Sequence, residues 1–216
     1  TANLGDGVTI TDAAAIAITA EDEREAASHA IGASVSGAVA AGASVATTSV
    51  GGRTEATAGD ALAVGQSVQS IDSLALSADS RVTATADTIA GKAGIGLAIS
   101  GSVATAKADN AVLAGIGDSA RISVDDGLSV SATATPRVAA DALGVNVAGG
   151  VGIGASVATA EASPDIDAHI GSDARIAADT VSVQATQAVP ILIPATTTTP
   201  PVFTHSADAY ARGAAG

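Results

Sequence analysis

The sequence predicts an all-β fold, a parallel β-solenoid (β-helix) built from repeats of about 54 residues. The first observation is internal similarity: the segment 74–126 aligns with 128–180 without a gap, and 20 of the 53 aligned positions are identical. The second is strict alternation of larger and smaller side chains, which is typical of strands. The third is a set of turn-forming sequences, Gly-Asp, Asp-Asp-Gly and Ser-Pro-Asp, between the alternating segments.

The repeats predict one continuous solenoid segment over residues 1–216. Its units are the end of one repeat, three whole repeats and the start of a fifth, at 1–15, 16–73, 74–127, 128–180 and 181–216. We expect two coils in each whole repeat, because coils of roughly 20–30 residues are common in solenoids. Since both ends cut a unit, we also expect a longer array. A Pro/Thr-rich insertion at 187–205 is predicted to leave the coil as a loop.

Residues 152–160, GIGASVATA, show the alternation most clearly. The odd-numbered residues from 153 to 159, Ile, Ala, Val and Thr, fall on one face of a strand, and glycine, serine and alanine fall on the other. The small face suits a strand that another layer of the same coil approaches closely. The larger face can stack on the next coil, so Val157 and Val103 are expected on the same face, one repeat apart.

The same alternation predicts further strands in segments rich in Val, Ile, Thr and Ser, at 120–125, 128–134 and 181–186. One segment competes with this assignment. Residues 13–30 are rich in alanine, the best helix former, and EDERE at 21–25 is compatible with a short helical turn. The glycine content elsewhere argues against longer helices.

The composition predicts a core of small aliphatic side chains. Apolar residues make up 47% of the chain, yet it has one Tyr, one Phe and no Trp, Met or Cys. A large apolar side chain contributes about 1.5–3 kcal/mol when fully buried, so burial here must be shared among many Ala, Val and Ile residues. The lack of cysteine excludes disulfides and thiolate metal sites.

The net charge of −13 and the pI of about 4.2 restrict the classes of partner. Nucleic acid is not expected, because nine Lys and Arg residues spread along the chain cannot form a basic face. No membrane insertion is expected either, since there is no apolar run of about 18–20 residues. These features favour an acidic, exported chain.

Residues 152–186 resemble the recurring unit of very large bacterial surface and secreted proteins, the filamentous-adhesin and leukotoxin-like group. The resemblance lies in the order of short elements: Gly-Ala-Ser-Val-Ala at 154–158, Ala-His-Ile-Gly at 168–171, Ala-Arg-Ile at 174–176 and Val-Ser-Val at 181–183. It implies a β-helical stalk exported to the bacterial cell surface or the medium, with a role in adhesion, biofilm or filament formation. It implies no shared catalytic residues. No cofactor is expected.

No catalytic, cofactor-binding or metal-binding residue is assigned from the sequence, and enzyme activity is not expected. His29, His169 and His205 occupy different positions in their units, and no Ser/His/Asp arrangement recurs around them. We interpret them as exposed or hydrogen-bonded side chains at turns. The glycine-rich GKAGIG at 91–96 lacks the spacing of a phosphate-binding loop.

The acidic turns come closest to a cation site. Calcium takes six to eight oxygen ligands, which a stack of carboxylates could supply. The preceding unit, however, has Ala111 and Leu113 where the segment 165–173 has its first two aspartates, so these ligands would not stack. We therefore interpret the acids as keeping the solenoid soluble. The possible cation ligands considered in these turns are Asp125, Asp126, Asp165, Asp167, His169 and Asp173.

The preferred function is a structural and interaction segment of an extracellular bacterial adhesin or filament, a repetitive stalk without catalysis. Its expected partners are neighbouring repeats, copies of itself, and cell-surface or matrix components. One alternative is a secreted β-helix enzyme acting on polysaccharides, which would need paired carboxylates in a cleft. Another is a ligand-binding module that uses the loop at 187–205. Ice binding would need a flat threonine ladder, whereas the threonine pairs at 9–11, 83–85 and 133–135 are scattered.

Overall fold

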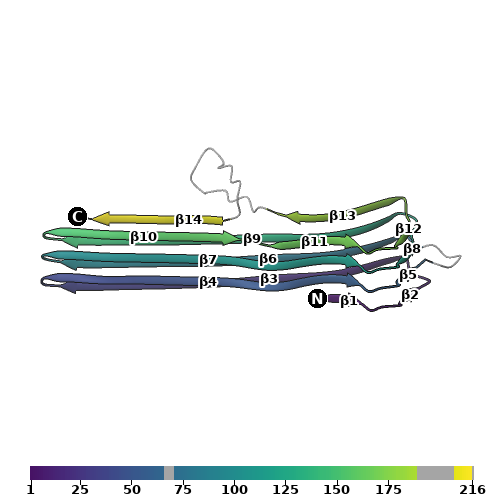
Figure 1. Cartoon of the computed structure of the whole chain (residues 1–216), viewed down its shortest axis with the longest axis horizontal. Coiled ribbons are helices and arrows are strands. Elements are labelled where there is room, and N and C mark those ends of the chain that lie inside the picture. The colour runs from purple at the N-terminus through teal and green to yellow at the C-terminus, as the bar shows by residue number, and fades with distance from the viewer. Residues whose placement is uncertain (66–70, 189–206, 216) are drawn as a thin grey trace.

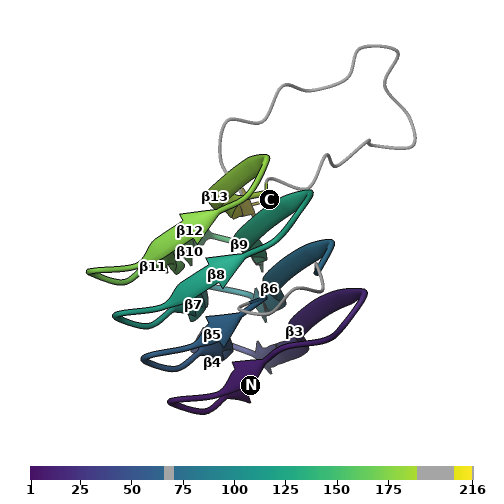
Figure 2. The same ribbon diagram turned by 90° about the vertical axis from the view of Figure 1, so that its right-hand side faces the viewer.

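The computed structural model describes residues 1–65, 71–188 and 207–215, the last of these by its backbone. Within these ranges all helix or strand structure is strand, and each strand pairs in parallel with its neighbours. The predicted all-β parallel solenoid is therefore confirmed. The long strands lie along the long axis of the molecule, and the coils stack one above the next across it (Figures 1 and 2).

Each coil consists of two long strands and one short strand. In the central coil these are β6 (Ser73–Gly94), β7 (Leu97–Ile116) and β8 (Arg121–Ser123). A two-residue turn reverses the chain between β6 and β7, and β8 closes the opposite end of the coil (Figure 1). The long strands run in opposite directions but belong to different sheets, which face each other across the interior.

Equivalent strands of successive coils form three parallel sheets. Sheet A contains β7 and β1 (Ala2–Leu4), β4 (Val39–Ala58), β10 (Val151–Ala162) and β11 (Asp165–Ile170). Sheet B contains β8 and β2 (Thr9–Ile10), β5 (Ala63–Val64) and β12 (Arg175–Ala177). Sheet C contains β6 and β3 (Ala15–Ser36), β9 (Gly127–Ala148), β13 (Thr180–Gln187) and β14 (Ala207–Ala215).

Each repeat forms one coil, so the expectation of two coils per repeat is wrong. Val103 pairs with Val157, one repeat later in the sequence, and with Val45, one repeat earlier. The physical reason is strand length: β6 has 22 residues and β7 has 20, whereas most strands have about 5–6. A single coil with two such strands takes up a whole repeat. The pairing also confirms that Val157 and Val103 lie on the same face, one repeat apart.

The predicted insertion interrupts a strand of sheet C. Before it, Gln187 pairs with Ala134, and after it, Ala207 pairs with Val138, so the chain returns to the same neighbouring strand, β9. Residues 188–206 thus take the place of the three residues that separate Ala134 from Val138 in β9. Most of the predicted loop, 189–205, lies outside the described residues.

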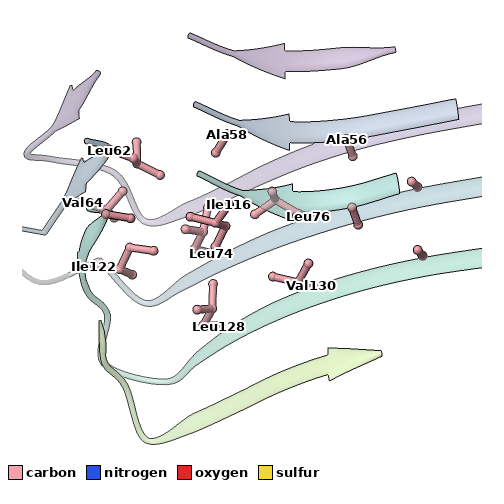
Figure 3. Close-up of a cluster of buried hydrophobic side chains, with 14 of the residues drawn as sticks. Ala56, Ala58, Leu62, Val64, Leu74, Leu76, Ile116, Ile122, Leu128 and Val130 are labelled. Carbon is pink, nitrogen blue, oxygen red and sulfur yellow. The ribbon is translucent and has the colours of Figure 1, made fainter. Parts of the chain in front are cut away.

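The interior is widest at the end that the short strands of sheet B close. There three sheets surround a cluster of leucine, isoleucine and valine side chains (Figure 3). Each of the largest members is less than 2% exposed, and burial of such a side chain contributes about 1.5–3 kcal/mol. The cluster includes Leu62, Val64, Leu74, Leu76, Ile116, Ile122, Leu128 and Val130.

Away from this end, only sheets A and C face each other, and the interior side chains become smaller. The middle of the coil is filled mainly by alanine, with Val50, Val82 and Val138. Ser28 and Thr48, which are hydrogen-bonded at 2.6 Å, also lie in this middle part. Nearer the two-residue turns, serine, glycine and other small or polar residues face inward, and Ser102 donates a hydrogen bond to Ser156 at 2.8 Å. The inward position of the Gly/Ser/Ala face agrees with the prediction for residues 152–160.

The segment EDERE does not form a helical turn; it lies within β3. Alternation places Asp22 and Arg24 on the inward side, where their side chains form an ion pair at 3.1 Å. Arg24 also donates a hydrogen bond to the carbonyl oxygen of Gly51 on the facing strand. A Cβ at Gly52, which has a φ of 156°, would collide with the guanidinium. Pairing along the full length of β6 outweighs the local helix propensity of this segment.

Candidate interaction surface

The outer surface is apolar in the distal half of each coil, which we define as the part next to the turns at 37–38, 95–96 and 149–150. Val35 is 85% exposed, Val45 61% and Ile153 54%. These side chains are outside because the inward positions between them hold glycine, serine and alanine, which the narrow interior requires. The sequence alternation predicted this division, but not that the larger face would be left uncovered.

The largest such area belongs to sheet A. We call it the sheet A apolar face: the odd-numbered residues of 39–47, 97–105 and 151–159, which alternate with inward positions and align in register across three coils. The row formed by Val45, Val103 and Val157 is identical in all three coils. The next row is a threonine ladder, formed by Thr47, Thr105 and Thr159.

This ladder changes one interpretation of the sequence. A threonine does recur at one outward position in every whole coil, which the scattered Thr-x-Thr sequences did not indicate. A comparison of Ser-Val-Ala-Thr, which recurs at 44–47, 102–105 and 156–159, would have found it. The neighbouring outward row is valine, so the ladder has the width of one residue.

Charged side chains begin where the apolar face ends. In the adjoining row Lys107 and Glu161 form an ion pair at 2.8 Å between neighbouring coils. The hydrogen bond and charge of Lys107 hold the pKa of Glu161 below its ordinary value, and Glu161 raises the pKa of Lys107 in return. On sheet C the outward residues Glu21, Glu23 and Glu25 lie in the other, proximal half, and Asp79, Arg81 and Thr83 take the same positions in the next coil. The proximal half thus carries charges of both signs, with acidic residues in excess.

An aspartate ladder follows the turn between sheets A and B. Each aspartate accepts a hydrogen bond from the backbone amide of the next coil: Asp6 from Asp60 at 3.0 Å, Asp60 from Asp118 at 2.8 Å, and Asp118 from Ser172 at 2.6 Å. The ladder explains why Gly-Asp recurs in the repeats, and it gives these acids a structural role.

We expect the Asp118→Ala variant to lose about 1 kcal/mol of unfolding free energy, because the amide of Ser172 would lose its acceptor at a site that water can reach. The Asp118→Asn variant is the matched control, since its amide oxygen can accept the same hydrogen bond. Urea unfolding followed by circular dichroism measures both. Equal losses in the two variants would contradict a hydrogen-bonding role.

The acidic segment at 165–173 does not gather into a cluster. Asp165 pairs with Ala111 and Asp167 with Leu113 in the neighbouring coil, as the sequence comparison predicted. The Nδ1 of His169 lies 3.0 Å from a carboxylate oxygen of Asp167. In the described ranges no three His, Asp or Glu side chains are close enough together to hold a metal ion.

A second row of ionisable residues crosses the outer face of sheet C. His29 pairs with Asp87, and Asp87 pairs with Asp141, so the three align across successive coils. They line a depression of about 330 Å³ together with Ile89 and Leu143. Comparison of the histidines with one another missed this row, whereas alignment of the whole repeats, 16–73 on 74–127 and 74–127 on 128–180, reveals it. His205 lies outside the described residues.

Two arginines align on the outer face of sheet B. Arg121 pairs with Arg175, and both line depressions of about 300 and 450 Å³. Guanidinium groups suit carboxylate and phosphate groups. Here, however, Asp173 lines the larger depression together with both arginines, so a carboxylate of the chain itself lies beside them.

The glycine-rich stretch at 91–96 spans the end of β6 and the turn that follows. Its lysine, Lys92, is 6% exposed and faces inward, so it is not presented to a phosphate in solvent. A Cβ at Gly42, on the facing strand of sheet A, would lie 2.7 Å from the Nζ of Lys92. Glycine at position 42 therefore provides the space for this buried side chain.

Comparison with protein-family models, with curated proteins and with solved structures gave no match. Over the ranges that the structure describes, no helix is long and apolar enough to span a membrane.

Proposed function

We propose that this chain is a structural and interaction segment of an extracellular bacterial adhesin or filament and that it performs no catalysis. The observation that carries the proposal is the in-register stacking of whole coils, in which each outer position lies beside the equivalent position of the next coil. Such stacking produces rows of identical groups, as in the valine and threonine rows of sheet A. A surface of this kind suits attachment to an extended partner.

The dimensions of the coil favour a role in presenting a broad surface over a role in spanning distance. A strand of 22 residues is roughly 70 Å long, whereas each added coil raises the stack by only about 4.8 Å. Each repeat therefore adds little height and a wide strip of outer face. A stalk whose task was to span distance would use shorter coils, so we assign the interaction role to the broad faces.

Location outside the cell is supported by the acidic composition. A secreted repeat protein gains solubility from a net charge of −13, and the acidic side chains discourage lateral association of the proximal halves. The resemblance of residues 152–186 to the filamentous-adhesin and leukotoxin-like group points the same way.

Immunogold labelling of bacteria that carry the gene tests the location. An antibody against residues 73–148 should label intact cells or extracellular material. Labelling only after permeabilisation would contradict the proposal.

Incubation of the purified protein with acidic and neutral polysaccharides tests the enzyme alternative. No release of reducing ends or unsaturated products is expected, because the outward carboxylates of Asp87 and Asp141 line an open depression and not a deep cleft. Turnover that the Asp87→Asn variant abolishes would support the enzyme instead.

A variant in which residues 188–206 are replaced by Thr-Pro-Arg, the sequence of 135–137, tests the ligand-binding alternative. Since Gln187 pairs with Ala134 and Ala207 with Val138, three residues can connect the two strand segments as they do in β9. We expect unchanged binding to cells and matrix. A loss of binding with an intact circular dichroism spectrum would assign the activity to the loop.

A further inference from the structure

We propose that the sheet A apolar face is an interface between two copies of this chain, packed face to face about a twofold axis parallel to the solenoid axis. The inference goes beyond the proposed function, because it requires neither an extracellular location nor a particular host surface. It rests on the relief of the face, on the distribution of charge and on the area available.

The relief of the face is self-complementary. The row Ala43, Gly101 and Ala155 forms a groove between two rows of larger side chains, which contain Ile99 and Ile153 on one side and the three valines on the other. Because every copy has the same strand spacing, the valine ridge of one copy can lie in the groove of the other over all three coils. A partner without this spacing would match one coil and miss the next.

The charge distribution selects the orientation of the two copies. A rotation about an axis parallel to the solenoid axis reverses the strand direction, so the distal halves overlap and the acidic proximal halves point away from each other. An axis along the strands would instead bring the proximal halves of sheet A together, where five outward carboxylates outnumber the side chains of Arg53 and Lys107, and repulsion between the net negative charges opposes this arrangement. The carboxylates are those of Glu55, Asp109, Glu161, Asp165 and Asp167. The proposed arrangement also keeps the two solenoid axes parallel.

The area predicts weak association that grows with the number of coils. Eight residue steps span roughly 27 Å and three coils roughly 14 Å, so the face measures roughly 400 Å². A stable interface buries about 800 Å² on each partner. Three coils thus supply about half of what a stable dimer needs, and pairing should depend on protein concentration.

Sheet C offers a poorer version of the same surface. Its apolar part has only three outward rows, to which the odd-numbered residues of 31–35, 89–93 and 143–147 contribute. The row with His29, Asp87 and Asp141 follows directly. This difference provides a matched pair of variants. Val103 on sheet A and Ile89 on sheet C are each 37% exposed and lie in the same coil.

Analytical ultracentrifugation of the intact chain over a concentration series tests the proposal. The weight-average mass of the wild type should rise from 20.3 kDa toward twice that value. The Val103→Glu variant should remain at 20.3 kDa, and Ile89→Glu should behave like the wild type. Thermal unfolding of all three proteins verifies that both variants are folded, and a Val103→Thr variant replaces Val103→Glu if the glutamate prevents folding.

Three results would overturn the proposal. The first is a wild type that stays monomeric at the highest soluble concentration. The second is loss of self-association in Ile89→Glu but not in Val103→Glu, which would place the interface on sheet C. The third is a monomeric protein that floats with phosphatidylcholine vesicles unless Val103 is replaced, which would assign the face to lipid. None of these results changes the immunogold labelling expected for an extracellular segment.

Discussion

The Ala106→Leu variant should lose about 3 kcal/mol of unfolding free energy or more, measured by urea unfolding. Ala106 is fully buried in the flat part of the coil and belongs to the same cluster as Ala86 and Ala104. Only sheets A and C enclose this region, and alanine sets their separation. Three additional carbon atoms would force the sheets apart, and the long strands would carry the displacement into neighbouring rows.

The control for this variant is Thr105→Leu, which introduces the same side chain at the preceding residue of β7. Thr105 faces outward on the sheet A apolar face, so the larger side chain meets solvent and not a second sheet. We expect a change within about 0.5 kcal/mol. A large loss at position 105 with little loss at 106 would contradict the assignment of the inward and outward faces.

The Leu128→Ala variant should lose about 2–5 kcal/mol of unfolding free energy. Leu128 is 1% exposed and contributes to the cluster that holds three sheets together (Figure 3). The chain has few large side chains to share this burial, and the rigid strands around the site limit collapse of the cavity. We expect the midpoint of thermal unfolding to fall accordingly.

Leu143→Ala provides the comparison on the same strand, β9. Leu143 faces outward and is partly exposed, so its truncation leaves no enclosed cavity. We expect a loss of about 1 kcal/mol or less. Similar losses at positions 128 and 143 would show that the wide end of the coil is not the main source of stability.

The sequence predicted the fold class and the inward face of residues 152–160 because both follow from local patterns. Alternation in GIGASVATA determines which residues can face a narrow interior, and the register of Val103 with Val157 follows from the repeat. The number of coils per repeat could not be read in the same way. Alternation shows which residues face inward, but it does not show how long a strand is before the chain turns. In β6 the alternation runs through all 22 residues.

The surface features were harder to predict because they depend on alignment between coils. His29 becomes part of a row only when stacking places it beside Asp87 and Asp141. The threonine ladder likewise appears only once Thr47, Thr105 and Thr159 are aligned. EDERE was ambiguous for a different reason: its local preference is overridden by pairing along the whole of β6.

Disulfide formation in engineered double-cysteine variants tests most directly that each repeat forms one coil. The chain has no cysteine of its own, so Val103→Cys with Val157→Cys reports on one pair of positions. Neighbouring strands lie about 4.8 Å apart, which a disulfide can bridge. Val103→Cys with Ser129→Cys, about half a repeat apart, is the control. Oxidation should close the 103–157 pair and leave 103–129 reduced; closure of 103–129 without 103–157 would contradict the one-coil fold.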